Sequence, residues 1–165
     1  MRHFDTAANG LRRTLMYTTL IAALSIGANA LADIQQGTQN GIAFENGGWS
    51  FETAQVIHSH AGKFPVMLVF AWNEGTYLSD VNVQVVNSKG ASVLGLNDLG
   101  PLVLIDLPKG AYTINVERHG KSQSRRVNVA ANTRTKAVFH WAKDESDRRA
   151  EVEVAGIKDP ASGTR

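Results

Sequence analysis

The stretch LPKGAYTINV, from Leu107 to Val116, decides the fold class of this chain. It joins the end of one strand to the start of the next through a tight turn. Pro108 fixes its own φ at about −65° and Gly110 can adopt a positive φ, so this pair favours a sharp reversal of the chain. After the turn, apolar and polar side chains alternate: Tyr112, Ile114 and Val116 on one side, Thr113, Asn115 and Glu117 on the other. This period of two predicts a half-buried antiparallel strand.

The residues on both sides of this stretch repeat the pattern of short strands separated by turns. The strands are predicted over residues 64–71, 81–87, 91–96, 101–107, 111–118, 121–130 and 133–141. Residues 64–71 are nearly all apolar, which predicts a strand buried on both faces. Lys121, Arg125 and Arg126 make residues 121–130 the most polar strand and predict a sheet edge. Seven strands with closely spaced turns favour a mainly β fold, an antiparallel seven-stranded β-sandwich, over a βαβ fold.

One short helix is predicted before the sandwich, over residues 51–61, and no other helix is expected in the folded part. Ser50 can cap its first turn, Glu52 meets the positive end of the helix dipole, and Gly62 suits its C-terminal end. The polar residues before it are expected to form a loop, a short strand over 42–44 and a turn. The apolar face of the helix would contain Phe51, Ala54 and Ile57 or His58.

The first 32 residues have the pattern of a secretion signal. Arg2, Arg12 and Arg13 precede an apolar run, Leu15–Gly27, that is too short to span a bilayer comfortably, and Ala30-Leu31-Ala32 offers a cleavage site. We expect a cleaved signal, a mature chain that begins at Asp33 and a location in the periplasm or outside the cell. The alternative is an N-terminal anchor that is never cleaved.

The composition of the remaining residues predicts three segments and argues against some classes of function. We expect an N-terminal segment with the short helix (33–63), one β-sandwich domain (64–141) and a flexible charged tail (142–165). The chain has 17 basic and 15 acidic residues, but the first 32 residues hold three arginines and one aspartate, so the remainder carries 14 of each. A neutral mature chain gives no support to nucleic-acid binding. The absence of cysteine excludes disulfides and thiolate metal sites, so the fold must rest on its hydrophobic core.

The order of these strands and turns resembles a known family. The pattern is similar to that of the carboxypeptidase regulatory-like domain, also called prealbumin-like or transthyretin-like. That family shows, in this order, a variable strand, an x-x-x-Gly turn, the motif Leu-Pro-x-Gly-x-Tyr and a hairpin that contains glycine. The similarity spans about Leu78 to Trp141, and the helix and strand before it resemble small exported proteobacterial proteins with such a domain. It implies a prealbumin-like Greek key, a fold that serves as folding modules, adhesin stalks and sugar-binding units. The matching positions are Gly90, Leu107, Pro108, Gly110, Tyr112 and Gly120.

Few residues suggest catalysis or metal binding. The sequence has no Gly-x-Ser-x-Gly elbow, phosphate loop, His-Glu-x-x-His or EF-hand spacing. His58 and His60 would suit a metal only on extended backbone, because residues i and i+2 face apart on the helix expected there. Asp80, Asp98 and Asp106 lie near strand ends, either as turn formers or as ligands of Ca²⁺. We predict no enzymatic activity, no cofactor and no metal.

The loop AWNEGTYLSD is the most suggestive functional element, because it places aromatic faces beside hydrogen-bonding groups. Its candidate binding residues are Trp72, Asn73, Glu74, Tyr77 and Asp80. The alternative is that Trp72 and Tyr77 plug the end of the sandwich over the core. We expect a non-catalytic envelope module that acts by protein–protein contact, or else a carbohydrate- or cell-wall-binding module that uses this loop.

Overall fold

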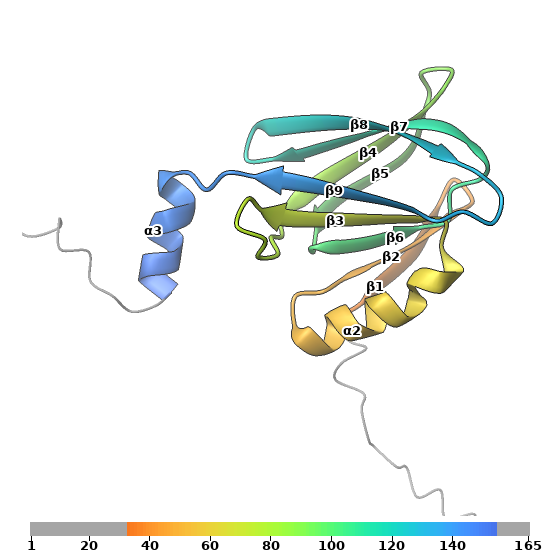
Figure 1. Ribbon diagram of the computed structural model, residues 1–165. Helices are drawn as coiled ribbons and strands as arrows, with labels where there is room; N and C mark the ends of the chain where they lie inside the picture. Colours follow the sequence, from red (N-terminus) through yellow and green to blue (C-terminus); the bar gives the residue numbers. More distant parts are fainter. Residues whose placement is uncertain (1–32, 155–165) are drawn as a thin grey trace, which may run out of the picture.

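Nine strands and two helices succeed one another in the computed structural model, which describes residues 33–154 (Figure 1). They are β1 (Gln35–Gln39), β2 (Ile42–Gly47), α2 (Phe51–His60), β3 (Val66–Trp72), β4 (Val81–Asn87), β5 (Ser92–Leu99), β6 (Leu102–Ile105), β7 (Gly110–Arg118), β8 (Lys121–Val129), β9 (Thr135–Trp141) and α3 (Glu145–Val154). The secretion signal predicted for residues 1–32 lies outside the described residues.

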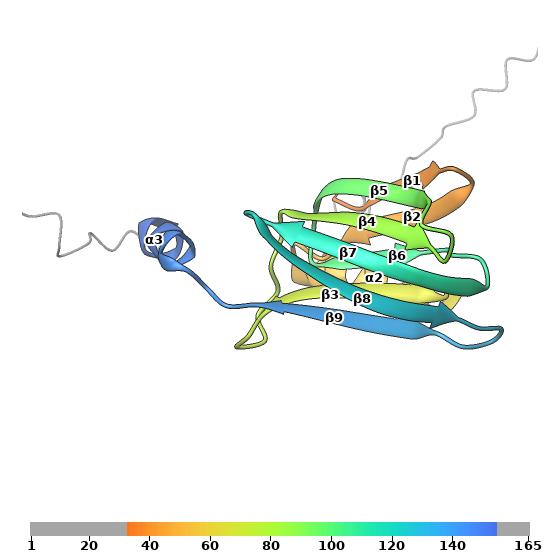
Figure 2. The same cartoon turned by 90° about the horizontal axis from the view of Figure 1, so that it is seen from above.

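The strands form two sheets that face one another, as predicted for a sandwich (Figure 2). One sheet has the order β1-β2-β6-β3-β9 and the other has the order β5-β4-β7-β8. The prediction of an all-antiparallel fold is wrong, because β3 pairs with β9 in parallel. The chain crosses between the sheets after β8, so β9 runs along β3 in the same direction and sets Trp72 beside Trp141.

The number of strands also differs from the predicted seven, because the N-terminal segment adds β1 and lengthens the predicted strand 42–44 into β2. All five residues of β1 are polar or glycine, so β1 carries no apolar alternation. It forms because Asn40 and Gly41 both adopt positive φ, 52° and 78°, and close a two-residue hairpin onto β2. An Asn-Gly pair is the sequence signal for such a turn.

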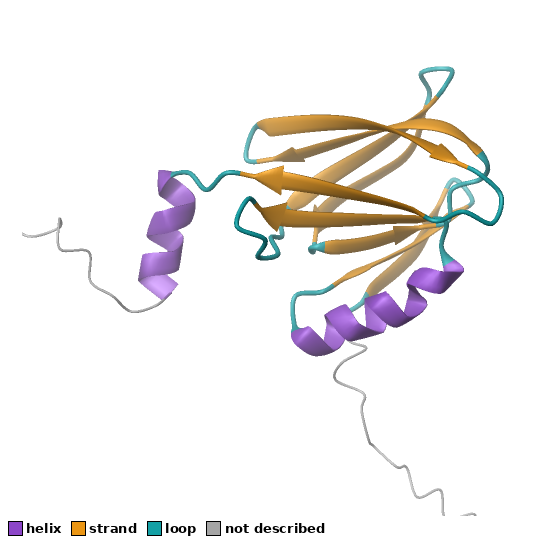
Figure 3. Ribbon diagram, viewed as in Figure 1, coloured by secondary structure: helices purple, strands orange, loops and turns teal. Residues whose placement is uncertain are grey.

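Two hydrophobic clusters hold the layers together. The larger lies between the sheets, and the smaller lies between the five-stranded sheet and α2, which covers the outer face of that sheet (Figure 3). The side chains of β6 alternate between the two clusters: Val103 and Ile105 belong to the larger cluster, whereas Leu102 and Leu104 belong to the smaller one. β3 divides in the same way, which confirms that this strand is buried on both faces.

Helix α2 begins where the sequence predicts it. The N–H of Thr53 donates to Ser50 Oγ (3.2 Å), and the N–H of Ser50 donates to Thr53 Oγ1 (3.1 Å), which together form a capping box. Ile57 is fully buried against the sheet, but the side chain of Phe51 is 73% exposed, so its predicted place on the buried face is wrong. The helix ends in a 3₁₀ turn over Ala61–Lys63 rather than in a left-handed glycine.

A second helix, α3, forms inside the segment predicted to be a flexible tail, so the prediction of a single helix is wrong. Its sequence, ESDRRAEVEV, has little apolar surface, and an isolated helix of this length is marginal in water. Asp144 caps it by accepting from the N–H groups of Ser146 (3.0 Å) and Asp147 (3.1 Å). The sequence could not show what holds this helix, because its main partner, Arg118, lies on β7.

Side chains cover part of the open edges of the sandwich. The amide of Asn40 donates to the carbonyl of Val93 (3.1 Å), and the N–H of Gly95 donates to Gln39 Oε1 (2.6 Å), so two side chains of the β1–β2 hairpin bond to the edge of β5. On the other side, Gln123 Nε2 of β8 donates to the carbonyl of His140 on β9 (2.8 Å). β8 is itself an edge strand, as its charges predict.

The turn residues that carry the family resemblance lie at reversals of the chain. Gly90 (φ +81°) ends the turn after β4, and Gly120 (φ +77°) lies in the hairpin between β7 and β8. Tyr112 folds back over Gly110, and its hydroxyl donates to the carbonyl of Pro108 (3.0 Å). These contacts account for the Pro, Gly and Tyr of the opening stretch by chain reversal and packing.

Candidate functional site

The five residues predicted as a binding loop connect β3 to β4, but they do not form one surface. Trp72 ends β3 and is 9% exposed, whereas Tyr77 is 45% exposed. Asn73 is exposed and donates its backbone N–H to the carbonyl of Trp141 (2.9 Å). Glu74 and Asp80 are exposed as well, and Asp80 turns the chain into β4 with a φ of +63°.

Two cations cover the ring of Trp72. The guanidinium carbon of Arg118 lies 4.6 Å from the ring centroid, and Lys143 Nζ lies 5.7 Å from it. The Arg118 side chain is only 10% exposed and is held by the carbonyl of Ser79 (3.0 Å) and by Asp147 Oδ1 (3.0 Å). Trp72 therefore plugs the end of the sandwich, which is the alternative that the sequence left open for this residue.

Helix α3 is docked on this end of the sandwich by ion pairs, and we call this set of contacts the α3 latch. Arg118 pairs with Asp147, whose side chain is 6% exposed, and Lys121 pairs with Asp144 (2.9 Å) at the surface. Lys143 lies between two carboxylates, Glu151 of the helix (2.6 Å) and Glu74 of the β3–β4 loop (2.8 Å). Hydrogen bonding to these two carboxylates raises the pKa of Lys143, and the hydrogen bond from Lys143 lowers the pKa of Glu74.

We expect the α3 latch to open in acid and after loss of Asp147. Hydrogen bonds from Ser146, then Lys121, then the N–H of Asp147 hold the pKa of Asp144 well below its ordinary value. A carboxylate with a lowered pKa stabilises the folded form above its unfolded pKa, about 4, and this contribution is lost as the pH falls through the folded-state pKa. NMR secondary shifts of residues 145–152 should therefore approach coil values as the pH falls below about 4.

Asp147→Asn should release α3 already at neutral pH, because Arg118 then loses its charged partner. The unfolding free energy of the sandwich should fall by less than about 1 kcal/mol, since α3 can detach without opening the core. Glu145→Gln, at an exposed position on the same helix, should keep the helix docked. Helical shifts that persist in both Asp147→Asn and acid would contradict the latch.

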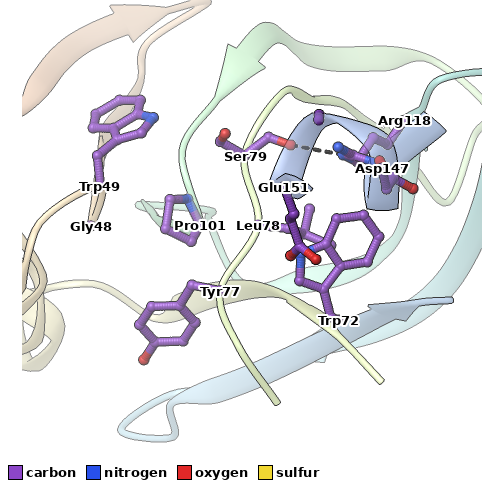
Figure 4. A pocket seen from close by; sticks show the side chains of 11 residues that line it. Gly48, Trp49, Trp72, Tyr77, Leu78, Ser79, Pro101, Arg118, Asp147 and Glu151 are labelled. Carbon is purple, nitrogen blue, oxygen red and sulfur yellow. Dashed lines mark hydrogen bonds and ion pairs between the residues drawn. The ribbon is translucent and has the colours of Figure 1, made fainter. Parts of the chain in front are cut away.

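A cavity of about 310 Å³ opens beside Trp72, between the β2–α2 corner, the β3–β4 loop and α3 (Figure 4). Its two sides differ in chemistry. Trp49, Tyr77 and Pro101 form an apolar side, and Arg118, Asp147 and Glu151 form a charged side. The Trp49 ring lies so close to Gly100 that a β-carbon added to this glycine would be only 2.7 Å from Trp49 Cε2.

Two of the residues that line the apolar side of this cavity are exposed aromatic residues, and a third exposed aromatic residue lies close to one of them in the sequence. Trp49 is 44% exposed and Tyr77 is 45% exposed, and Phe51 follows Trp49 at the start of α2. Phe51 and His58 are seven residues apart, so they share one side of α2, and His58 Nε2 lies 3.4 Å from Tyr77 Oη. We call Trp49, Phe51 and Tyr77 the aromatic surface. Of these, only Tyr77 belongs to the predicted site.

The sequence did carry a signal for the two aromatic residues that the prediction missed. Trp49 and Phe51 flank the capping residue Ser50, directly after two glycines. The helix buries Ile57 and packs Ala54 in part, so its contact with the sheet does not need Phe51. Two large aromatic side chains that the core does not need are an indication of a binding surface.

The histidines and aspartates named as metal candidates do not come together. His60 Nδ1 lies 2.7 Å from Glu45 Oε2, which joins α2 to β2, and His58 faces Tyr77 instead. Asp98 lies in β5, whereas Asp106 follows β6 and donates its N–H to the carbonyl of Ala43 (2.9 Å). Within residues 33–154, no group of three or more His, Asp or Glu side chains is placed to hold a metal ion.

Comparisons with known proteins do not assign this chain to a family. Its sequence matches no protein-family model, and it matches no curated protein. Neither helix of the described residues has the length or the apolar character needed to cross a membrane.

Proposed function

We propose that this chain is an exported, non-catalytic β-sandwich module that binds another protein of the cell envelope through the aromatic surface. The proposal needs no cofactor and no metal. Export rests on the charged, apolar and small-residue pattern of residues 1–32, which is a sequence argument. The observation that carries the binding proposal is the exposure of Trp49 and Tyr77 on one cavity, with the exposed Phe51 two residues after Trp49.

Trp and Tyr are enriched among the few residues that dominate protein–protein binding energies. They bury large apolar areas while ordering few torsions, and the Tyr hydroxyl retains a polar contact. We infer that the partner inserts an apolar side chain between Trp49 and Tyr77. The charged side of the cavity, with Arg118 and Asp147 already paired, then contributes shape rather than a free charge.

The structure supports a glycan site centred on Trp72 less well. Sugar stacking needs an uncovered aromatic face, but Arg118 and Lys143 lie over this ring and the residue is 9% exposed. Glu74 is also engaged with Lys143 (2.8 Å). Among the five predicted residues, this leaves Tyr77 as the aromatic group with substantial exposure.

We also propose that β3 to β9 form a prealbumin-like Greek key of the carboxypeptidase regulatory-like kind. Support comes from the connection in which β6 crosses to the other sheet before β7 returns beside β4. The Pro108–Tyr112 contact and the left-handed Gly90 and Gly120 agree with the turn pattern of that family.

Trp49→Ala should weaken binding to the partner by about thirtyfold, which corresponds to a loss of about 2 kcal/mol at a hot spot. The protein is to be purified from the periplasmic fraction, where its mass should give Asp33 as the first residue. A photo-crosslinking residue at position 51 should capture the partner, whereas one at position 128, on exposed β8, should not. The captured protein is then purified and titrated.

Tyr77→Phe serves as the matched control, because it keeps the ring and loses only the hydroxyl that faces His58. Its affinity should stay within about threefold of the original, whereas Tyr77→Ala should behave as Trp49→Ala does. Equal affinities for the original protein and for Trp49→Ala, with both folded, would refute the aromatic surface as the binding site. An intact Met1 in the periplasmic fraction would refute a cleaved signal.

A further inference from the structure

A second hollow lies on the outer face of the four-stranded sheet, which carries no helix in the described part of the chain (Figure 1). It is an open groove of about 360 Å³ across β5, β4, β7 and β8. We call it the amide groove. Its polar lining side chains are Asn82, Gln84, Asn97, Asn115, Glu117 and Ser122.

The chemistry of the amide groove is uniform. Its outward side chains are amides, a hydroxyl and one carboxylate, and none of the lining residues is basic or aromatic. Each amide offers a donor and an acceptor side by side, which matches the hydroxyls of a sugar because those also donate and accept. A protein partner would instead favour aromatic, Met or Arg side chains at the centre of its contact.

Several residues of the groove oppose the local preference of a strand. Asn is depleted in strands, yet Asn82, Asn97 and Asn115 occupy strand positions on the same face. Gly95 lies inside β5, where glycine weakens a strand, and a β-carbon built on it would meet nothing within 4 Å. Positions where the sequence opposes local propensity are expected at functional sites, and here they gather on one face.

A β-bulge forms the rim of the groove. Val81 pairs with Leu99 and Val83 pairs with Leu96, so two residues of β5, Asn97 and Asp98, face Asn82 alone. Asp98 has a left-handed φ of +53°, and its N–H donates to Asn82 Oδ1 (3.2 Å). Bulges of this kind redirect side chains beside binding sites.

The carboxylate of Glu117 selects against anionic ligands. Its Oε2 accepts from Asn82 Nδ2 (2.9 Å), and its Oε1 accepts from the N–H of Gly120 (2.5 Å). The hydrogen bond from Asn82 is the main cause of the lowered pKa of Glu117. A glutamate side chain is ionised at neutral pH with or without this shift. A negative acceptor among neutral amides suits hydroxyl donors and repels uronic acids and phosphates.

We propose that the amide groove binds a neutral oligosaccharide through hydrogen bonds from Gln84, Asn97 and Asn115 to its hydroxyls. The groove is open and lacks a stacking ring, so the dissociation constant should be on the order of 1 mM. The site is separate from the aromatic surface, and the groove variants described below leave Trp49, Phe51 and Tyr77 unchanged. The protein would then bind a glycan through the polar amide groove and a protein partner through the aromatic surface.

The test titrates the purified protein with cellohexaose, laminarihexaose, chitohexaose and hexagalacturonate, and follows backbone amide shifts by NMR. At least one neutral hexasaccharide should shift residues of β4, β5 and β7, with little response to the anionic hexagalacturonate. Gly95→Leu should fold, since the space above Gly95 is open, and should weaken binding at least tenfold by filling the groove. Gln84→Val together with Asn115→Val should have the same effect without lowering the melting temperature, because Val favours strands.

Asn128→Val is the matched control, because Asn128 is an exposed Asn of β8 that does not line the groove. Its affinity should equal that of the original protein. The proposal is overturned by no shift with any neutral hexasaccharide, by tighter binding of hexagalacturonate, or by glycan binding that survives both groove variants. Loss of glycan binding on Trp49→Ala alone would move the site to the aromatic surface and would also overturn it.

Discussion

Phe70→Ala is expected to lower the free energy of unfolding by about 3–5 kcal/mol, the largest effect of any single substitution considered for this fold. Phe70 is fully buried in β3 at the centre of the cluster between the sheets. Its ring lies 6.1 Å from the Phe139 ring and 6.2 Å from the Trp141 ring, centroid to centroid. Removing it deletes apolar contacts and leaves a cavity that two rigid sheets cannot close.

Phe51→Ala provides the matched control for this substitution. The same side chain is deleted, but Phe51 is 73% exposed at the start of α2, so the free energy of unfolding should change by no more than about 0.5 kcal/mol. Urea unfolding followed by circular dichroism measures both free energies. An unchanged dependence of the unfolding free energy on urea concentration would show that the substitutions do not alter the unfolded state. A loss below 1 kcal/mol for Phe70→Ala would mean that β3 does not lie in the core.

The strands that the sequence predicted well are those whose pattern arises from local geometry. β4 was predicted over the residues that form it, 81–87, because Val81, Val83 and Val85 alternate with polar residues across a single buried face. β1 lacks such a face, and only the Asn-Gly turn after it indicated a hairpin. The parallel pairing of β3 with β9 joins segments about 70 residues apart, and nothing within either strand records it.

The candidate site was less predictable because it is assembled from distant segments. The composition of residues 72–80 drew attention to this end of the sandwich, but whether the Trp72 ring is free to bind a ligand depends on Arg118 of β7 and on Lys143 after β9. Trp49 comes from the β2–α2 corner and lines the same cavity. α3 was missed for a related reason, since a charged helix is held here by ion pairs to other elements rather than by an apolar face.

Asn46→Ala is expected to cost about 2–3 kcal/mol, although it deletes only a small polar group. Asn46 in β2 is fully buried; its Oδ1 accepts from the N–H of Gly100 (2.9 Å), and its Nδ2 donates to Gln35 Oε1 (3.1 Å). Gly100 is buried as well, so alanine at position 46 would leave its N–H without a partner and out of reach of water.

The hydrogen bond between Asn46 and Gly100 also connects the stability of the fold to the proposed function. Gly100 supports the ring of Trp49, so a loosened Gly100 turn should increase the mobility of the aromatic surface and weaken partner binding beyond what the stability change predicts. Hydrogen exchange at the Gly100 amide should accelerate in Asn46→Ala, and urea unfolding gives the stability loss. Asn128→Ala, the same deletion at an exposed strand position, should change stability by no more than about 0.5 kcal/mol. Unchanged Gly100 exchange in Asn46→Ala would show that the buried amide does not organise this end of the sandwich, and the aromatic surface would then depend on α2 alone.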